Sequence, residues 1–319
     1  MEYGKFIISL DFELHWGGAE KWDLQKMSQY FLDTRTSIPE VLELFAENNI
    51  NATWATVGFL FAKNKKQLLE FSPIEKPSYK NTSLSYYSYF EKMGDSEDDD
   101  PFHYAFSLIK KIIETPGQEL ATHTFAHYYC MEEGQNIQQF SADLMAAQKI
   151  AQNNFGIKLT SLVFPRNQYN RDYLSVAQMN GIEVVRSNPN VWFWRNSKGK
   201  ITPIFRALDT LIPISRPLAF DEEKLIKRSD IIELPASRFF RPYTENERFI
   251  QTIKLNRILT EMTYAARNNL CYHLWWHPHN FGNNVQENLK QLALIIKHYR
   301  ELNEKFGFVS VTMDNFKLK

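Results

Sequence analysis

Two patterns of apolar positions alternate along this chain. Short, mainly apolar runs, typical of strands buried on both faces, lie at 6–10, 52–60, 119–122, 160–164, 182–185, 230–234, 270–276 and 308–312. Segments with apolar residues at helical spacing lie at 37–48, 139–153, 171–180, 245–268 and 285–302. Strands that alternate with helices pair in parallel, so the pattern predicts an α/β fold. The number of strands favours a (β/α) barrel, with room for irregularity, over an open nucleotide-binding sheet, and no G-x-G-x-x-G or P-loop follows any strand.

Two local features modify this regular pattern. The capping box Ser37-Ile-Pro-Glu40 predicts that the first helix begins at Ser37. Residues 64–116 break the alternation with a Ser/Tyr-rich stretch and the acidic run at 97–100. We expect an insertion that covers the barrel mouth, with the acidic run as a solvated loop. The sequence has neither an internal repeat nor an interdomain linker, so residues 1–319 are expected to form a single domain.

The composition narrows the class of protein. Lys and Arg together number 37, as do Asp and Glu, so the chain lacks the positive charge that nucleic-acid binding requires. Cys130 and Cys271 form no C-x-x-C pair, which argues against a thiolate metal site or a disulfide framework. The first residues lead directly into the run at 6–10 without a signal-peptide pattern, and no apolar run is long enough to span a bilayer. These features predict a cytoplasmic protein without a transmembrane segment.

Polar residues gather at the carboxyl ends of four predicted strands, where a parallel barrel has its active site. These segments are Asp11–Trp16, His123–His127, Phe164–Gln168 and Trp276–Asn280. Asp11, Glu13 and His15 alternate with apolar residues, so an extended backbone would direct all three to one side. Two carboxylates this close favour a cation between them, and they suit one metal ligand and one base. A surface strand end with ordinary charges is the alternative.

Histidines provide further candidates. His123 and His127 are four residues apart, so a helical turn would aim both imidazoles at one point, as in many two-histidine metal sites. His273 and His277 have the same spacing, but four residues of a strand span about 13 Å and cannot chelate one ion. We therefore expect His273 to be a packed core residue. His277 or His279 could donate a proton to a leaving group.

A guanidinium completes this set of groups. Arg166 follows Pro165 at a strand end, and beside two carboxylates it could hold one of them ionised through bidentate hydrogen bonds. A structural salt bridge is the alternative role. The sequence has no G-x-S-x-G elbow and no catalytic cysteine context, which disfavours a covalent hydrolase. A cation held by two histidines and a carboxylate, with a second carboxylate as base and a histidine as acid, favours metal-assisted hydrolysis.

Taken in order, these segments resemble the polysaccharide deacetylases, the NodB-homology group of carbohydrate esterases, over most of the chain. The first family motif is similar to Ser9-Leu-Asp-Phe-Glu13, and the H-[ST]-x-x-H motif matches His123-Thr-Phe-Ala-His127. The Arg/Pro motif is similar to Phe164-Pro-Arg-Asn167, and the late Leu-x-His motif looks like Leu274-Trp-Trp-His277 with an offset of one residue. The resemblance implies an irregular (β/α)7 barrel. It also implies the roles of single residues: Asp11 as general base, His123 and His127 as metal ligands, Arg166 as the residue that orients the base, and His277 as general acid.

Phe12 departs from the family, because it stands where the usual member has a metal-binding aspartate. Glu13, on the same face as Asp11, is the substitute ligand that we expect beside His123 and His127. The site would hold one divalent ion, zinc or another first-row metal. The resemblance thus implies a metal-dependent hydrolase that removes an N-acyl group, expected to be acetyl, from an amino sugar. Its substrate would be a lipid-linked or nucleotide-linked sugar in cytoplasmic polysaccharide biosynthesis.

Two alternatives stay open. Phe12 would also suit a carbohydrate-binding pseudoenzyme on the same scaffold, and a chain without the metal could be an amidohydrolase that acts on a small cyclic amide. For the deacetylase, we expect a backbone N–H near Asn167 to bind the oxyanion. The chain has 24 Phe, 15 Tyr and 7 Trp, and a groove lined with aromatic rings suits sugars. The candidate platforms are Trp16, Trp192, Trp194 and Trp276.

Overall fold

The computed structural model describes residues 3–189, 191, 217–228 and 231–318. The strands are β1 (Lys5–Phe12), β2 (Ala52–Thr56), β3 (Gln118–Thr122), β4 (Ser161–Leu162), β5 (Val184–Ser187), β6 (Ile226–Arg228), β7 (Ile231–Pro235), β8 (Arg238–Phe239), β9 (Cys271–Trp276) and β10 (Val309–Val311). Each predicted apolar run overlaps one of these strands. The run at 52–60 differs most, because its second half forms the 3₁₀-helix η2 (Gly58–Phe61).

The strands form one curled sheet in the order β6-β7-β5-β4-β3-β2-β1-β9-β8, with β10 beside the first half of β1. Only β6, which is antiparallel to β7, departs from parallel pairing among the described strands. β7 leads through Ala236 and Ser237 into β8, which pairs with β9 at the other end of that order. The chain thereby brings the two ends of the sheet together. Counting β7 and β8 as one position, β1, β2, β3, β4, β5, β7 and β9 give the irregular (β/α)7 barrel expected from the sequence.

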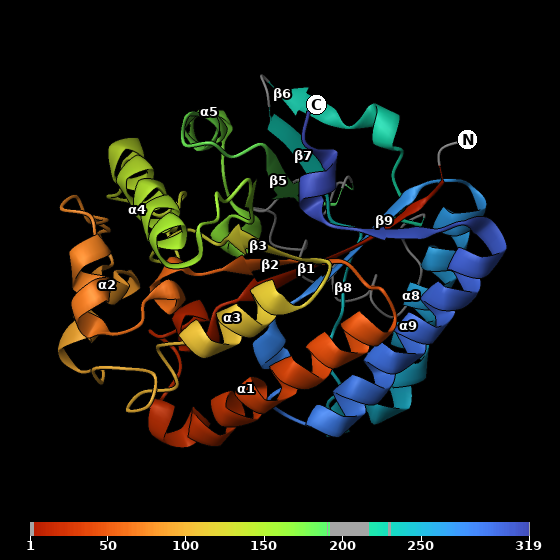
Figure 1. Cartoon of the computed structure of the whole chain (residues 1–319), viewed down its shortest axis with the longest axis horizontal. Coiled ribbons are helices and arrows are strands. Elements are labelled where there is room, and N and C mark those ends of the chain that lie inside the picture. Colours follow the sequence, from red (N-terminus) through yellow and green to blue (C-terminus); the bar gives the residue numbers. More distant parts are fainter. Residues whose placement is uncertain (1–2, 190, 192–216, 229–230, 319) are drawn as a thin grey trace.

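Helices surround the curled sheet, as Figure 1 shows. The described α-helices are α1 (Leu24–Glu47), α2 (Lys65–Phe71), α3 (Phe106–Glu114), α4 (Ile137–Phe155), α5 (Arg171–Met179), α8 (Gln251–Arg267) and α9 (Val285–Phe306). The predicted helices at 139–153, 171–180 and 285–302 agree closely with α4, α5 and α9. The first part of the predicted helix at 245–268 is the 3₁₀-helix η7 (Glu245–Ile250).

The beginning of α1 corrects the sequence-based prediction. The helix is capped by Asp23, and Ser37 lies inside it, where its hydroxyl donates to a backbone carbonyl one turn earlier. Pro39 also lies in the helix interior. Phe31 and Ile38 are buried on the same face, so apolar burial continues across the boundary that the capping box had indicated. That burial outweighs the local signal for a helix start.

Residues 64–116 contribute to the core of the barrel as well as to its surface. Tyr86, Phe90 and Tyr104 are buried in the main hydrophobic cluster. Within the same segment, α3 packs against β3 and restores the strand–helix alternation. Removal of this segment would therefore expose core residues.

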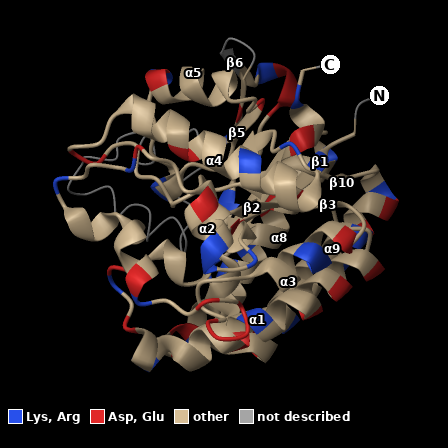
Figure 2. Ribbon diagram, turned by 60° about the vertical axis from the view of Figure 1, so that its left-hand side comes forward, with Lys and Arg blue, Asp and Glu red and all other residues tan. Residues whose placement is uncertain are grey.

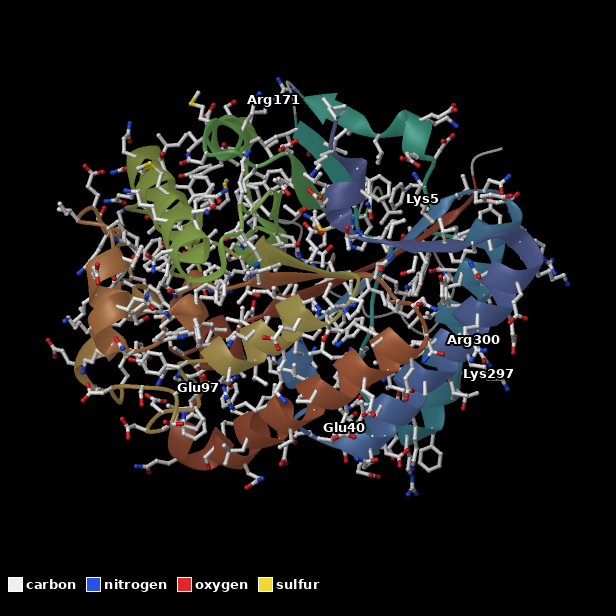
Figure 3. All side chains as sticks on the ribbon, in the orientation of Figure 1. Lys5, Glu40, Glu97, Arg171, Lys297 and Arg300 are labelled. Carbon is white, nitrogen blue, oxygen red and sulfur yellow. The ribbon has the colours of Figure 1, made fainter. Side chains whose placement is uncertain are left out.

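The acidic run at 97–100 is not the solvated loop that we expected. Glu97, labelled in Figure 3, forms an ion pair with Arg35 of α1. Asp100 is buried and bonds to Nδ1 of His103 at 2.7 Å. Two of the four carboxylates therefore fasten the segment to its surroundings.

Positions of basic and acidic residues are interspersed along the ribbon in Figure 2. This distribution fits the equal totals of 37 basic and 37 acidic residues. Among the helices that the structure describes, none is both long enough and apolar enough to cross a membrane.

Candidate active site

Glu13 is fixed by a sharp turn at the end of β1. Leu14 has a φ of +47° and bends the chain out of the strand into the 3₁₀-helix η1 (Leu14–Gly17). Gly17 lies so close that a Cβ there would stand 2.0 Å from Oε2 of Glu13. The same turn directs His15 away from the site, and its Nδ1 lies 2.9 Å from Nε2 of His103. The expectation of three polar groups on one face therefore fails for His15, because the backbone does not stay extended.

His123 and His127 belong to an irregular loop after β3 and not to the helical turn that their spacing suggested. Thr124 and His127 have φ values of +65° and +54°, which no helix allows. The buried carboxylate of Asp143 in α4 holds the loop by accepting from two consecutive backbone N–H groups at 2.7 and 3.0 Å. These bonds replace the helical hydrogen bonds and orient both histidines.

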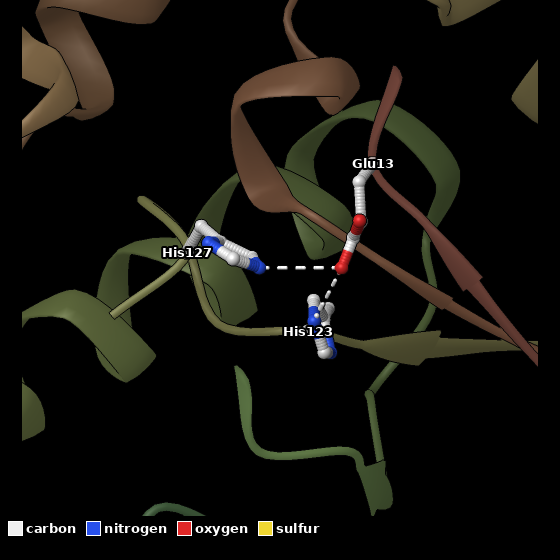
Figure 4. Close-up of side chains that lie close together, drawn as sticks. All are labelled: Glu13, His123 and His127. Atoms are coloured by element: carbon white, nitrogen blue, oxygen red, sulfur yellow. Dashed lines mark hydrogen bonds and ion pairs between the residues drawn. The ribbon is translucent and has the colours of Figure 1, made fainter. Parts of the chain in front are cut away.

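The loop brings both imidazoles to Glu13 (Figure 4). Nε2 of His123 lies 2.9 Å from Oε1 of Glu13, and Nε2 of His127 lies 3.2 Å from the same oxygen. All three side chains are buried, and we call them the donor set. Within the described residues, Nδ1 of His123 makes no hydrogen bond, and its Nε2 forms an ion pair with Glu13 that lacks hydrogen-bond geometry. A buried imidazole held this way beside a carboxylate is suited to a cation between them.

The spacing of the donor set fits a divalent ion. Zinc–ligand distances of about 2.0–2.1 Å in a tetrahedral site place neighbouring ligand atoms about 3.3 Å apart. The observed 2.9 and 3.2 Å would need only a small outward movement. Burial alone would raise the pKa of Glu13, but the nearby histidines, His277 first, outweigh it and hold the pKa well below its ordinary value. Glu13 is therefore ionised at neutral pH and could serve as an anionic ligand.

Asp11 is held by a side chain that the sequence analysis missed. Arg186 of β5 donates from Nη1 to Oδ1 at 2.6 Å and from Nη2 to Oδ2 at 2.7 Å. In a flat sheet, β1 and β5 would lie about 19 Å apart across the three strands between them, so this pair exists because the sheet is curled. Burial alone would raise the pKa of Asp11, but the charge and hydrogen bonds of Arg186 outweigh it and lower the pKa. Asp11 is thus a buried, ionised carboxylate.

A second layer of hydrogen bonds supports Arg186. Its Nη1 donates to Ser9 Oγ at 3.0 Å, and its Nη2 donates to Oδ1 of Asn167 at 3.0 Å. His273 is a fully buried core residue, as expected, and burial lowers its pKa to about 3. Its Nδ1 lies 3.2 Å from the carbonyl of Pro235 and its Nε2 lies 2.8 Å from Ser9 Oγ. Since the carbonyl can only accept, Nδ1 carries the proton and Nε2 accepts from Ser9.

Arg166 makes no ion pair with Asp11 in the described structure. Its Nη1 donates to Glu132 at 2.6 Å, and its guanidinium lies 4.0 Å from the ring centroid of Tyr129. The bidentate pair expected of Arg166 is made by Arg186 instead. Arg166 has a φ of +58°, so the chain turns there and its side chain leaves the barrel interior. Arg186 directly follows the fifth predicted strand, so the search for polar residues at strand ends could have found it.

His277 faces both carboxylates from the end of β9. Its Nε2 lies 3.7 Å from Oδ2 of Asp11 and 3.9 Å from Oε1 of Glu13, and its side chain is 26% exposed. His279 is buried, and burial lowers its pKa to about 3. Of these two histidines, His277 is therefore the more accessible to a bound molecule and the better candidate for a proton donor.

Asp11, Glu13, His127 and His277 line a pocket of about 460 Å³. Its lining residues are Asp11, Glu13, Gly17, Lys21, Trp22, His127, Arg166, Asn167, Phe239, Trp275, His277, His279 and Asn280. The aromatic lining consists of Trp22, Phe239 and Trp275. Trp16 and Trp276, expected to bind sugar rings, are fully buried, whereas Trp192 and Trp194 lie outside the described residues.

One backbone N–H in the segment expected to bind the oxyanion is engaged in a turn. The backbone N–H of Asn167 donates to the carbonyl of Phe164 at 2.8 Å, within a 3₁₀ turn. The side chain of Asn167 serves Arg186 instead. This N–H is therefore not free for an oxyanion.

The barrel and its site can now be compared with known proteins. Residues 29–185 match the family model described as polysaccharide deacetylase. Over these residues, just under half of the chain, the protein is similar to the polysaccharide deacetylase family. The part of the chain that matches the model contains His123, His127 and Arg166, whereas Asp11, Glu13, Arg186 and His277 lie before or after it. A comparison with curated proteins gave no significant match.

Solved structures share the fold of this chain. A Mycobacterium smegmatis protein assigned to the polysaccharide deacetylases has a TM-score of 0.60 at 12% identity and covers 98% of this chain and 89% of its own. A Pseudomonas aeruginosa PAO1 protein with the same assignment has a TM-score of 0.53 at 10% identity, and the match covers 98% of this chain and 88% of that protein. A GH57-type branching enzyme from the archaeon Pyrococcus horikoshii has a TM-score of 0.54 at 12% identity, and the match covers 98% of this chain and 69% of that enzyme. At these identities the likeness concerns the fold alone.

Proposed function

We propose that this chain is a metal-dependent hydrolase that removes an N-acyl group, expected to be acetyl, from an amino sugar. The observation that carries the proposal is the position of Asp11, an ionised carboxylate, in the pocket that Glu13 and His127 of the donor set also line. When bound, such an ion would supply Lewis-acid polarisation of the acyl carbonyl and would acidify a water molecule. Zinc or another first-row ion suits two imidazoles and one carboxylate.

The proton transfers would be carried by Asp11 and His277. As the oxygen of water bonds to the acyl carbon, one proton passes to Asp11, which Arg186 has kept ionised. When the C–N bond breaks, His277 gives a proton to the departing amine. The products are a carboxylate and a free amino sugar. The 3.7 Å between Nε2 of His277 and Oδ2 of Asp11 puts both groups within reach of one reacting amide.

The pocket supports a sugar as substrate. Trp22, Phe239 and Trp275 offer flat apolar surfaces on which a pyranose can stack. Lys21 and Arg166 also belong to the lining and would favour a substrate with an anionic group, such as a nucleotide-linked or diphospholipid-linked sugar. We therefore propose a role in cytoplasmic polysaccharide biosynthesis.

The test is release of acetate from a panel of N-acetylated nucleotide sugars and oligosaccharides. We expect turnover of at least one substrate, its loss after treatment with a chelator, and its return when zinc is added. Turnover that a chelator leaves unchanged would instead favour a metal-free amidohydrolase. Binding of these sugars without any acyl release would favour a carbohydrate-binding pseudoenzyme.

A further inference from the structure

The hydroxyl groups of two tyrosines connect His127 to a carboxylate below the surface. Nδ1 of His127 lies 3.0 Å from the hydroxyl of Tyr129, which lies 2.8 Å from the hydroxyl of Tyr86. Tyr86 in turn donates to Oε2 of Glu20 at 2.5 Å. We call Tyr129, Tyr86 and Glu20 the hydroxyl relay. It joins a candidate metal ligand to a negative charge through two groups that can each donate and accept.

The direction of every bond follows from Glu20. Burial alone would raise the pKa of Glu20, but the bond from Tyr86 and the charge of Lys21 outweigh it and lower the pKa. An ionised carboxylate can only accept, so the hydroxyl hydrogen of Tyr86 points at Glu20 and its oxygen accepts from Tyr129. Tyr129 then has no hydrogen left for His127. Its oxygen must accept a hydrogen bond, and the donor is the N–H at Nδ1 of His127.

We propose that the hydroxyl relay sets the tautomer of His127, with the proton on Nδ1 and Nε2 left for a metal ion. The inference rests on the metal site proposed above. Glu13 favours the opposite tautomer, because a proton on Nε2 could bond to its Oε1, 3.2 Å away. Two ligands joined by that hydrogen bond would have to separate before an ion could bind. The relay opposes this bond, so Tyr129, Tyr86 and Glu20 are positioning residues for the donor set.

The relay also accounts for two features that the proposed reaction does not use. Tyr86 lies in the 3₁₀-helix η4 (Tyr86–Glu91), so the segment at 64–116 reaches the site through this hydroxyl. Arg166 lies 4.0 Å over the ring of Tyr129, and its Nη2 is 3.7 Å from Oε1 of Glu20. Arg166 therefore packs against the relay rather than against the base.

Tyrosine-to-phenylalanine variants test the relay because they keep the rings and remove single hydroxyls. Tyr86→Phe takes away the acceptor of Tyr129, which should then turn and donate to Nδ1 of His127. Tyr129→Phe removes the acceptor of His127 directly. Tyr89→Phe is the matched control, because Tyr89 lies in the same helix η4 and donates to the carbonyl of Ala19, outside the relay.

Two measurements on the full-length chain decide the outcome. Long-range ¹H–¹⁵N spectra of the metal-free protein, assigned with a His127→Gln variant, should show the proton of His127 on Nδ1 in wild type and in Tyr89→Phe. Tyr86→Phe should move it to Nε2. Zinc affinity, measured by competition with a chromophoric chelator, should fall by about 10- to 100-fold in Tyr86→Phe and Tyr129→Phe and stay at the wild-type value in Tyr89→Phe. The double variant should bind no more weakly than Tyr129→Phe, because Tyr86 acts only through Tyr129.

Two results would overturn the relay. One is a wild-type His127 with its proton on Nε2. The other is a zinc affinity that falls equally in Tyr86→Phe and Tyr89→Phe, which would point to general damage to the helix. Neither readout depends on catalysis, so a chain that releases no acetate would refute the proposed function and leave the relay standing. If wild type bound no zinc, the metal site would be refuted, and the spectra would still decide the tautomer.

Discussion

Arg186→Met should destabilise the fold and disable the base, because it leaves the carboxylate of Asp11 in the barrel interior without its cation. Asp11 is 3% exposed, and Arg186 is fully buried. Arg186 makes five hydrogen bonds, two of them to Asp11. Removal of one partner from a buried ion pair costs about 3–5 kcal/mol. We expect the free energy of unfolding to fall by that amount.

The same substitution should change the pH dependence of acyl release. Without Arg186, burial raises the pKa of Asp11, so protonation of the base begins at a higher pH. The acid limb of the kcat/KM profile should therefore shift upward. Arg166→Met is the matched control, since it removes a guanidinium that lies on the pocket wall and is 32% exposed. Such a partly exposed ion pair contributes about 0–1 kcal/mol, and the acid limb should stay in place.

Urea denaturation gives the stabilities, and initial rates of acetate release between pH 5 and pH 9 give the profiles. The reasoning would be refuted if both variants lost the same stability. It would also be refuted if the acid limb moved in Arg166→Met and not in Arg186→Met, because Arg166 would then be the residue that acts on Asp11.

Two further predictions concern the surroundings of the site. Gly17→Ala should weaken zinc binding by at least about 100-fold, because its Cβ would displace Oε2 of Glu13. Gly18→Ala should bind zinc normally, because the nearest neighbour of its Cβ would be the ring of Trp22 at 3.3 Å. Chelator competition on both variants checks this, and equal affinities would contradict it. Burial lowers the pKa of His273 to about 3, so the folded state favours the neutral imidazole. The contribution of His273 to the free energy of unfolding is therefore complete above pH 6.5 and declines as the pH falls toward 3. The stability advantage of wild type over His273→Gln should therefore shrink by about 2 kcal/mol between pH 7.5 and pH 5.0, and urea denaturation that gives a constant difference would contradict it.

The alternation of strands and helices could be predicted from the sequence because apolar periodicity is a local signal. The convergence of the donor set could be predicted for a related reason: Glu13, His123 and His127 lie within a few residues of predicted strand ends, and parallel strands bring those ends together. The curvature of the sheet then brings these strand ends around one site. Their spacing along the chain was less informative than their position, since the two histidines converge without a helical turn.

The features that were missed depend on contacts between distant segments. Arg186 and Asp11 are 175 residues apart, and only closure of the barrel makes them partners. The departure of His15 depends on a positive φ at Leu14, a conformation that no sequence pattern indicates for leucine. The early beginning of α1 at Leu24, capped by Asp23, depends on burial against the barrel, which outweighs the boundary indicated by Ser37.

The central claim is that Asp11 and Glu13 have different roles, base and metal ligand. Zinc content and acyl-release rate should be measured side by side for Asp11→Asn and Glu13→Ala. Asp11→Asn is nearly isosteric, so it should keep most of the zinc while the rate falls by about 10²- to 10⁴-fold. Glu13→Ala should lose the zinc, because two histidines alone form a weak site. An Asp11→Asn variant that loses its zinc, beside a Glu13→Ala variant that keeps both zinc and activity, would contradict the account and make Asp11 the ligand.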